Sequence, residues 1–187
     1  LGSLFNKLST ADVRFNSYVH PTSVIDPDYA TSPNYRDSDI LAINKYAGSE
    51  GQPLMNDLKL IRGAEMLFIL AEAGANGGSD LAGAAALIAE IRLARGSEVV
   101  TPAVYASEQE AFADILAERR IELAFEGHRW VDLKRLGGIA NVSIDKDPRD
   151  CEITGGCTLP VNDFRFTLPI PLRELDLNSQ LVQNTNY

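Results

Sequence analysis

Residues 107–138 read SEQEAFADILAERRIELAFEGHRWVDLKRLGG, and this stretch decides the fold class of the chain. It opens with a capping box, in which Ser107 precedes Glu110 by three residues, and this pattern predicts the start of a helix. We expect the helix to run to Glu126. After a glycine, a second helical segment should cover residues 128–136 and end at a pair of glycines.

An arginine lies within the apolar stripe of the first of these helices. The stripe consists of Phe112, Ile115, Leu116 and Leu123. Arg119 falls on the same face, and a charge inside an apolar stripe is costly unless it is paired. We therefore expect Arg119 to be buried and bound to a carboxylate of a neighbouring helix, with Glu65 and Glu72 as the best candidates.

Two further helices are expected before this stretch. Residues 58–75 contain no proline and precede an Asn-Gly-Gly turn, and a second helix runs from a cap at Ser79 or Asp80 to about Arg95. A loop this short makes the two helices antiparallel neighbours. The first helix is apolar on most sides, which predicts packing on most sides. Stacked helical pairs favour an α-solenoid, so the fold class is mainly α.

The flanks of this helical region, residues 58–137, are less regular. Residues 1–57 are loop-rich, and only 15–19 and 40–45 are candidate strands. Residues 138–187 lose the helical period and should hold little β structure. Within them we expect a hairpin turn at Gly155–Gly156, an extended segment over 166–171 and a helical turn at 173–176.

The composition is that of one ordinary globular domain: 187 residues, 45% of them hydrophobic and 23% charged. Lys and Arg number 17 against 26 Asp and Glu, which gives a net charge of −9. This balance argues against nucleic acid and against an anionic membrane surface as partners. The longest uninterrupted apolar runs, 66–71 among them, have six residues, far fewer than a spanning helix needs.

Catalytic and metal-binding patterns are missing from the sequence. Glu118, Glu122 and Glu126 form an i, i+4, i+8 row that lacks the Glu-x-x-His pairs of a di-iron site. We assign the row to structural ion pairs with the arginines of the same region: Arg119, Arg120, Arg129 and Arg135. His20 and His128 lie in no nucleophile–base motif, and with the cysteines they fit no zinc spacing. We therefore expect no enzymatic activity, no metal and no cofactor.

Ligand binding is the remaining class of function. Tyr29 and Tyr35 lie among prolines and small polar residues, and such loops suit sugars, because aromatic faces stack on sugar rings and polar groups bind hydroxyls. The alternative is that these rings pack under their own loop. Trp130 has helical spacing to Leu133 and is expected in the core. Cys151 and Cys157 could form a disulfide in an oxidising compartment or stay free thiols in the cytosol.

Residues 118–137, ERRIELAFEGHRWVDLKRLG, resemble the signature of the SusD/RagB family of outer-membrane nutrient-binding lipoproteins. Segments 11–14, 62–73, 91–96 and 168–187 resemble further motifs of that family, in the family's order. In the first of these segments Val13 stands where the family has proline.

The resemblance implies a tetratricopeptide-like α-α superhelix. The chain would be the C-terminal portion of a longer protein whose lipidated N-terminal cysteine and upstream helices lie outside it. It also implies export, which favours a Cys151–Cys157 disulfide. The implied function is capture of an oligosaccharide or polysaccharide for a TonB-dependent outer-membrane transporter, on the outward face of the cell, with membrane contact only through the lipid anchor. The alternative is a helical scaffold that acts mainly through contact with that transporter.

Overall fold

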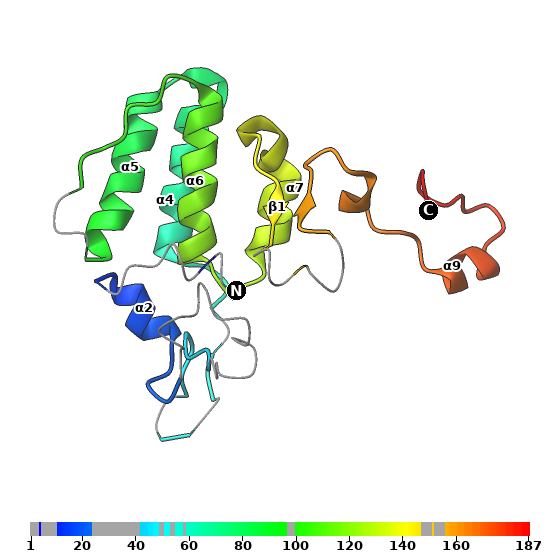
Figure 1. Cartoon of the computed structure of the whole chain (residues 1–187), viewed down its shortest axis with the longest axis horizontal. Helices are drawn as coiled ribbons and strands as arrows, with labels where there is room; N and C mark the ends of the chain where they lie inside the picture. The colour runs from blue at the N-terminus through cyan, green and yellow to red at the C-terminus, as the bar shows by residue number, and fades with distance from the viewer. Residues whose placement is uncertain are drawn as a thin grey trace.

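Figure 1 shows the fold in a computed structural model of the chain. The structure describes residues 4, 11–23, 42–48, 51–52, 55–57, 59–96, 100–146, 151 and 156–187. Its helices are α2 (Val13–Tyr18), α4 (Gly63–Ala75), α5 (Leu81–Ala94), α6 (Glu108–Glu122), α7 (His128–Ala140) and α9 (Leu172–Leu177). Two short 3-10 turns, η1 (Asn76–Gly78) and η2 (Phe164–Phe166), and two short strands complete the described elements.

The centre of the molecule is a stack of helices. Figure 1 shows α4, α5 and α6 side by side, with α7 next to α6. Their facing sides bury one apolar core, which includes Phe68, Ile88, Ile115, Leu116 and Leu133. The short turn η1 joins α4 to α5 as an antiparallel pair. The predicted mainly α, tetratricopeptide-like architecture is confirmed.

Local capping signals set two helix starts as predicted. The Oγ of Ser107 accepts a hydrogen bond from the Glu110 N–H at 3.2 Å, and the Glu110 carboxylate accepts one from the Ala106 N–H at 2.8 Å. The Asp80 carboxylate likewise accepts a hydrogen bond from the Gly83 N–H at 2.8 Å. Each bond joins residues at most four positions apart, so the sequence pattern was sufficient to find it.

Three predicted helix boundaries are wrong. Helix α4 begins at Gly63 rather than at residue 58, because Arg62 has an extended backbone and its side chain reaches to α6. Helix α6 ends at Glu122 rather than Glu126. Helix α7 continues through the two glycines and ends at Ala140, because Gly137 serves packing and not termination. A Cβ on Gly137 would lie 3.0 Å from both the Val142 carbonyl oxygen and a Val161 methyl group.

The outer side of α4 contradicts the expectation of packing on most sides. Phe68, Ala71 and Ala75 face the core, whereas Met66, Ile69 and Leu70 are exposed. Within the described part of the chain, α4 packs mainly against α5 and α6, which lie on the same side of it. One apolar face of α4 is therefore at the surface.

The flanks hold little strand, as predicted, but residues 15–19 were assigned wrongly. They lie mostly in α2, which Asp12 caps by accepting a hydrogen bond from the Arg14 N–H at 2.8 Å. The described part of segment 40–45 contributes a single bridge, between Ile43 and Val19. Strands β1 (Ile144–Asp145) and β2 (Thr158–Leu159) pair antiparallel on either side of the predicted hairpin turn, part of which lies outside the described residues.

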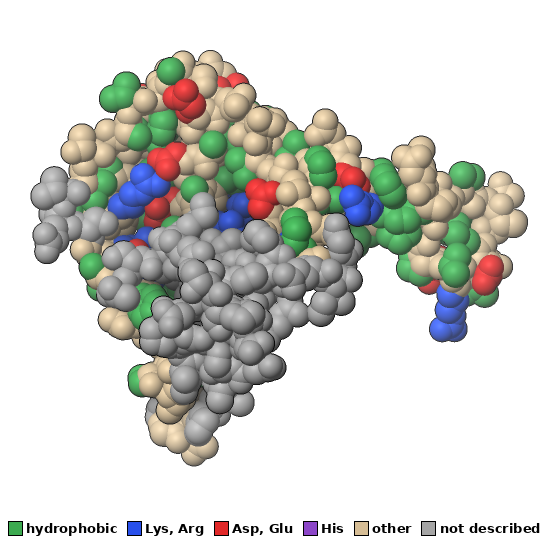
Figure 2. All heavy atoms as spheres, in the orientation of Figure 1, with side chains coloured by type: hydrophobic (Ala, Val, Ile, Leu, Met, Phe, Trp, Pro, Cys, Tyr) green, Lys and Arg blue, Asp and Glu red, His purple; other side chains and the backbone are tan. Residues whose placement is uncertain are grey.

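The C-terminal segment leaves the helical stack. Figure 1 shows it extending away from α7, and α9 lies in it where a helical turn was predicted. Figure 2 shows hydrophobic side chains on its surface. They include the exposed residues Leu168, Leu172, Leu177 and Val182.

Candidate functional site

A row of carboxylates on α6 binds basic side chains from other segments. Glu122, in the middle of the row, is 0% exposed. It accepts hydrogen bonds from Arg95 at 2.7 and 2.9 Å, from Arg62 at 2.5 Å and from Arg14 at 3.3 Å. Arg95 caps the end of α5, Arg62 precedes α4, and Arg14 lies in α2. One buried carboxylate thus joins four segments of the chain.

The other two carboxylates of the row extend this network. Glu118 accepts hydrogen bonds from Arg14 at 2.6 Å and from Arg92 at 2.7 Å. Glu126, beyond the end of the helix, forms an ion pair with Lys45. Figure 2 shows acidic and basic side chains next to one another on the face over α5 and α6.

These partners correct the sequence-based assignment of the row to the arginines of α6 and α7. A row with i, i+4 spacing stays on one side of its helix, and that side faces α2, α5 and the residues before α4. The arginine partners come from segments 11–14, 62–73 and 91–96, three of the segments that carry the family resemblance. Three of these segments therefore meet the signature helix at the carboxylate row.

The network is a structural element. Burial by itself would raise the pKa of Glu122, but the hydrogen bonds from Arg95 and the charges of Arg95, Arg62 and Arg14 outweigh it and lower that pKa. Among the described residues, no buried side-chain nitrogen or oxygen lacks a hydrogen-bond partner. The carboxylates and their basic partners therefore satisfy one another and connect α6 to α2, to α5 and to the residue before α4.

Of the two carboxylates predicted to bind Arg119, only Glu72 lies near it, and its closest partner is a third carboxylate. Arg119 is 4% exposed and donates hydrogen bonds to both carboxylate oxygens of Asp132, at 2.8 and 2.9 Å. Glu72 lies 3.5 Å from the same guanidinium and binds Arg135 more closely, at 2.7 Å. Glu65 instead lies 3.9 Å from His128.

Sequence reasoning missed Asp132 as a partner. The sequence did contain an indication that Asp132 is buried, because Asp132 shares a helical face with Leu136. A carboxylate on a buried face needs a charged partner, as an arginine does.

Two further sequence-based expectations concern the cysteines and the loop tyrosines. The structure joins Cys151 to Cys157 by a disulfide, with 5.1 Å between the Cα atoms. Tyr29 and Tyr35 lie outside the described residues. The structure therefore gives no position for the two tyrosines expected to contact a ligand.

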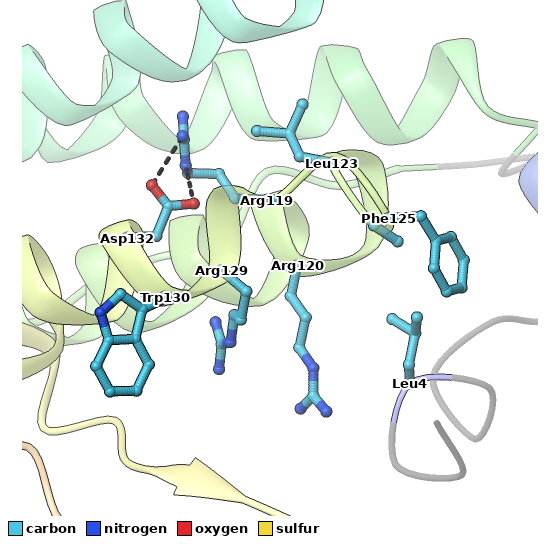
Figure 3. A pocket seen from close by; sticks show the side chains of 10 residues that line it. Leu4, Arg119, Arg120, Leu123, Phe125, Arg129, Trp130 and Asp132 are labelled. Atoms are coloured by element: carbon cyan, nitrogen blue, oxygen red, sulfur yellow. Dashed lines mark hydrogen bonds and ion pairs between the residues drawn. The ribbon is translucent and has the colours of Figure 1, made fainter. Parts of the chain in front are cut away.

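A pocket of about 410 Å³ lies where α6 turns into α7 (Figure 3). Its charged lining among the described residues consists of three arginines and one aspartate: Arg119, Arg120, Arg129 and Asp132. Asp132 is bound to Arg119, and the other two charged residues of this lining are Arg120 and Arg129. Figure 3 shows both side chains projecting to the same side of the two helices.

Aromatic side chains line the same pocket. The turn between the helices contains two residues with left-handed backbones, Phe125 at φ 67° and Gly127 at φ 82°. A bulky residue in this region is strained, and such strain occurs at functional sites. The Phe125 ring is 42% exposed and meets the Tyr18 ring edge-on. Trp130 is half-buried and stacks on Phe166 at 5.0 Å, so it belongs to the core as expected and also lines the pocket.

Arg129 differs from the arginines of the ion-pair networks. In the described part of the chain its hydrogen bond goes to a main-chain oxygen, that of Leu116, at 3.3 Å. Burial, followed by the positive charge of Arg120, lowers the pKa of Arg129 to about 10, and the charges of Asp132 and Asp145 offset this only in part. Burial also lowers the pKa of Arg120, which Asp145 partly offsets. In contrast, the carboxylates around Arg92 and Arg135 raise the pKa of each above its ordinary value, against the effect of burial.

Comparisons with known proteins identify the family. The SusD family model matches residues 16–187. SusD-like protein P38 of Formosa agariphila is 32% identical, and the match covers 83% of this chain and 30% of that protein. A SusD superfamily protein of Bacteroides fragilis (20% identity, TM-score 0.67) covers 99% of this chain, and one of Bacteroides thetaiotaomicron (25%, 0.69) covers 98%. Each match covers 39% of the solved chain.

The chain belongs to the SusD family, as the sequence resemblance indicated. It spans about a third of the length of the curated relative and about two fifths of the solved structures. No helix in the described ranges is long and apolar enough to cross a membrane.

Proposed function

We propose that this chain is part of a protein that binds an oligosaccharide or polysaccharide without modifying it. The protein would face outward from the outer membrane on a lipid anchor and deliver its ligand to a TonB-dependent transporter. The observation that carries the proposal is family membership over residues 16–187, because capture of nutrient glycans is the function that this family implies. The chain would form the C-terminal portion of the complete protein.

The pocket between α6 and α7 supports binding of a sugar. Sugar rings present C–H faces that stack on aromatic side chains, and Phe125 offers an exposed ring at the pocket. Tyr29 and Tyr35 are proposed as further contacts, in the loop-rich first zone. In this proposal the helices form a rigid scaffold, and the groups that bind the sugar lie on its turns and loops.

The second candidate is a scaffold that mainly contacts the transporter. The exposed apolar face of α4, formed by Met66, Ile69 and Leu70, favours it, because apolar surface gathered on one helix face is typical of protein contacts. In this case sugar affinity would lie elsewhere in the complete protein or be absent.

A glycan array on the full-length protein, followed by calorimetric titration, separates the two candidates. If the protein binds glycans, the array should identify a specific glycan that is recovered uncleaved after incubation. Phe125→Ala should weaken the affinity for that glycan about tenfold, because it removes a stacking partner. Phe164→Ala is the matched control, since Phe164 is 41% exposed and lies outside the described pocket lining. Tyr29→Ala and Tyr35→Ala test the loop contacts in the same titration. Binding of the transporter with no glycan hit would favour the scaffold.

A further inference from the structure

A lysine from the loop-rich first zone binds the turn that carries Phe125. The Lys45 side chain is 6% exposed, and its ammonium donates hydrogen bonds to the main-chain oxygens of Glu122 at 2.7 Å and Ala124 at 2.8 Å. It also forms an ion pair with the carboxylate of Glu126. Lys45 therefore binds the residue immediately before Phe125 and the residue immediately after it.

The backbone of Phe125 needs such support. Its φ of 67° lies in the left-handed region, which is unfavourable for a bulky side chain. A residue in this region keeps its conformation only where the surrounding structure fixes the chain. Arg62 binds two of the same groups as Lys45, but the hydrogen bond to the Ala124 oxygen comes from Lys45. This oxygen belongs to the peptide group that leads into Phe125, so the bond acts directly on the left-handed backbone.

Lys45 also helps to fix the surface on which the Phe125 ring lies. Its ammonium is 4.4 Å from the centre of the Tyr18 ring, and the Tyr18 hydroxyl donates a hydrogen bond to the Glu122 oxygen at 3.0 Å. The main chains are joined next to both residues, because the Asn44 N–H donates to the Tyr18 oxygen at 2.8 Å. The Phe125 ring meets the Tyr18 ring edge-on, with 6.2 Å between the ring centres. The backbone and the ring of Phe125 thus contact groups that Lys45 holds.

The loss of Lys45 should act locally. Its described hydrogen bonds and ion pair reach the last residue of α6 and the turn that follows. The helical stack is joined instead by its apolar core and by arginines such as Arg95 and Arg119. Removing the ammonium should therefore loosen the turn and leave the stack folded.

We propose that Lys45 is a positioning residue of the glycan site, which holds the turn so that the Phe125 ring lies at the pocket in the orientation that stacks on a sugar. This inference rests on the proposed glycan-binding function and adds to it the residue that orders its aromatic contact. A ring that is ordered before binding spares the complex the entropic cost of ordering it. Loss of Lys45 should thus weaken binding without removing any group that touches the sugar.

The test is a double-mutant cycle, measured by calorimetric titration of the full-length protein with the oligosaccharide that binds most tightly on the glycan array. Lys45→Met should weaken the affinity by at least about threefold and by no more than Phe125→Ala does, because its effect passes through that ring. In the Phe125→Ala background the same substitution should leave the affinity nearly unchanged. A substitution that disturbed the whole fold would weaken binding in both backgrounds.

Further variants control for the chemistry of the substitution. Lys45→Arg keeps the charge and the hydrogen-bond donors and should restore part of the affinity. Lys134→Met removes an exposed lysine from α7 and should leave the affinity unchanged. If Lys45→Met failed to fold, Lys45→Gln would replace it in the cycle with the same expectations.

A second measurement needs no glycan. A 4-trifluoromethylphenylalanine introduced at position 125 of the full-length protein reports the state of this ring by fluorine NMR. We expect one narrow resonance in the otherwise unaltered protein. Lys45→Met should broaden or split it, and Lys134→Met should not. Melting temperatures of the same proteins show whether each is folded at the temperature of the measurement.

The outcomes separate this inference from the function on which it rests. An unchanged narrow resonance in folded Lys45→Met would overturn the positioning role, whatever the protein binds. Equal weakening by Lys45→Met in the unaltered and Phe125→Ala backgrounds would overturn action through Phe125 and leave glycan binding in place. The absence of any bound glycan on the array would overturn the glycan function, and with it the role of Lys45 in sugar binding.

Discussion

The guanidinium of Arg119 on α6 and the carboxylate of Asp132 on α7 form a buried, two-point ion pair. It joins the two helices on the core side of the turn that contains Phe125. Both residues of the pair also line the pocket, together with Arg129 and Arg120. The pair therefore sets the relative position of the helices on which the candidate ligand groups lie.

The first prediction follows from this pair. Arg119→Met should lower the free energy of unfolding by about 3–5 kcal/mol, because it leaves the Asp132 carboxylate buried without its main partner. Adding Asp132→Leu should recover part of the loss, since an apolar pair of similar volume avoids the unpaired charge. Arg165→Met, which breaks an exposed pair with Asp163, is the control and should leave the free energy of unfolding nearly unchanged, because solvent screens an exposed pair. Denaturant unfolding measures all three, and equal stability of Arg119→Met and the unaltered protein would contradict the structural role of the pair.

The second prediction concerns pH. The pKa of Glu122 is lower in the folded protein than its ordinary value of 4.5, so the folded state favours its ionised form. The stability it contributes is present above the unfolded pKa and is lost as pH falls through the folded one. Glu122→Gln should therefore be less stable than the unaltered protein at pH 7, and the difference should shrink below about pH 4.

Thermal unfolding from pH 7 to pH 2 measures this effect. Glu174→Gln, on exposed α9, is the control and should follow the unaltered protein across the range. If the melting temperatures of Glu122→Gln and the unaltered protein differed by the same amount at every pH, ionisation of Glu122 would not be coupled to stability.

The third prediction uses two adjacent glycines in α7. Gly137→Ala should destabilise the protein, because the new Cβ would lie 3.0 Å from the Val142 carbonyl oxygen, a main-chain atom that cannot move cheaply. Gly138→Ala should stabilise it by about 0.5–1 kcal/mol, because nothing lies within 4 Å of the new Cβ and alanine is the better helix former. An unchanged or higher melting temperature for Gly137→Ala would show that the contact at Gly137 is not close.

The fourth prediction concerns the disulfide. Protein purified without reductant should show no free thiol for Cys151 or Cys157 in a thiol titration under denaturing conditions. The double Cys→Ser variant should lose about 2 kcal/mol, because so short a loop gains little from closure. Two titrating thiols in the unreduced protein would refute the bridge.

The sequence alone determined that the central stack consists of helices and where two locally capped helix starts lie. Ser107 with Glu110, and Asp80 with Gly83, bond within four residues of one another, so a pattern in the chain contains both partners. It also identified Arg119 as a charge inside an apolar stripe. It did not find that α7 continues past Gly137, because the close contact that requires this glycine comes from Val142 and Val161, and Val161 is far along the chain.

Only the tertiary structure decided which charges meet. The carboxylates of α6 bind Arg14, Arg62, Arg92 and Arg95, and the first of these lies 104 residues from Glu118. Ion pairing is set by distance in space, and every arginine offers the same chemistry, so spacing along the chain cannot rank partners from distant segments. The pocket likewise depends on the tertiary structure. Arg120 and Arg129 are nine residues apart in the sequence, and the turn through Phe125 and Gly127 brings them to one side of two helices, where both line the pocket.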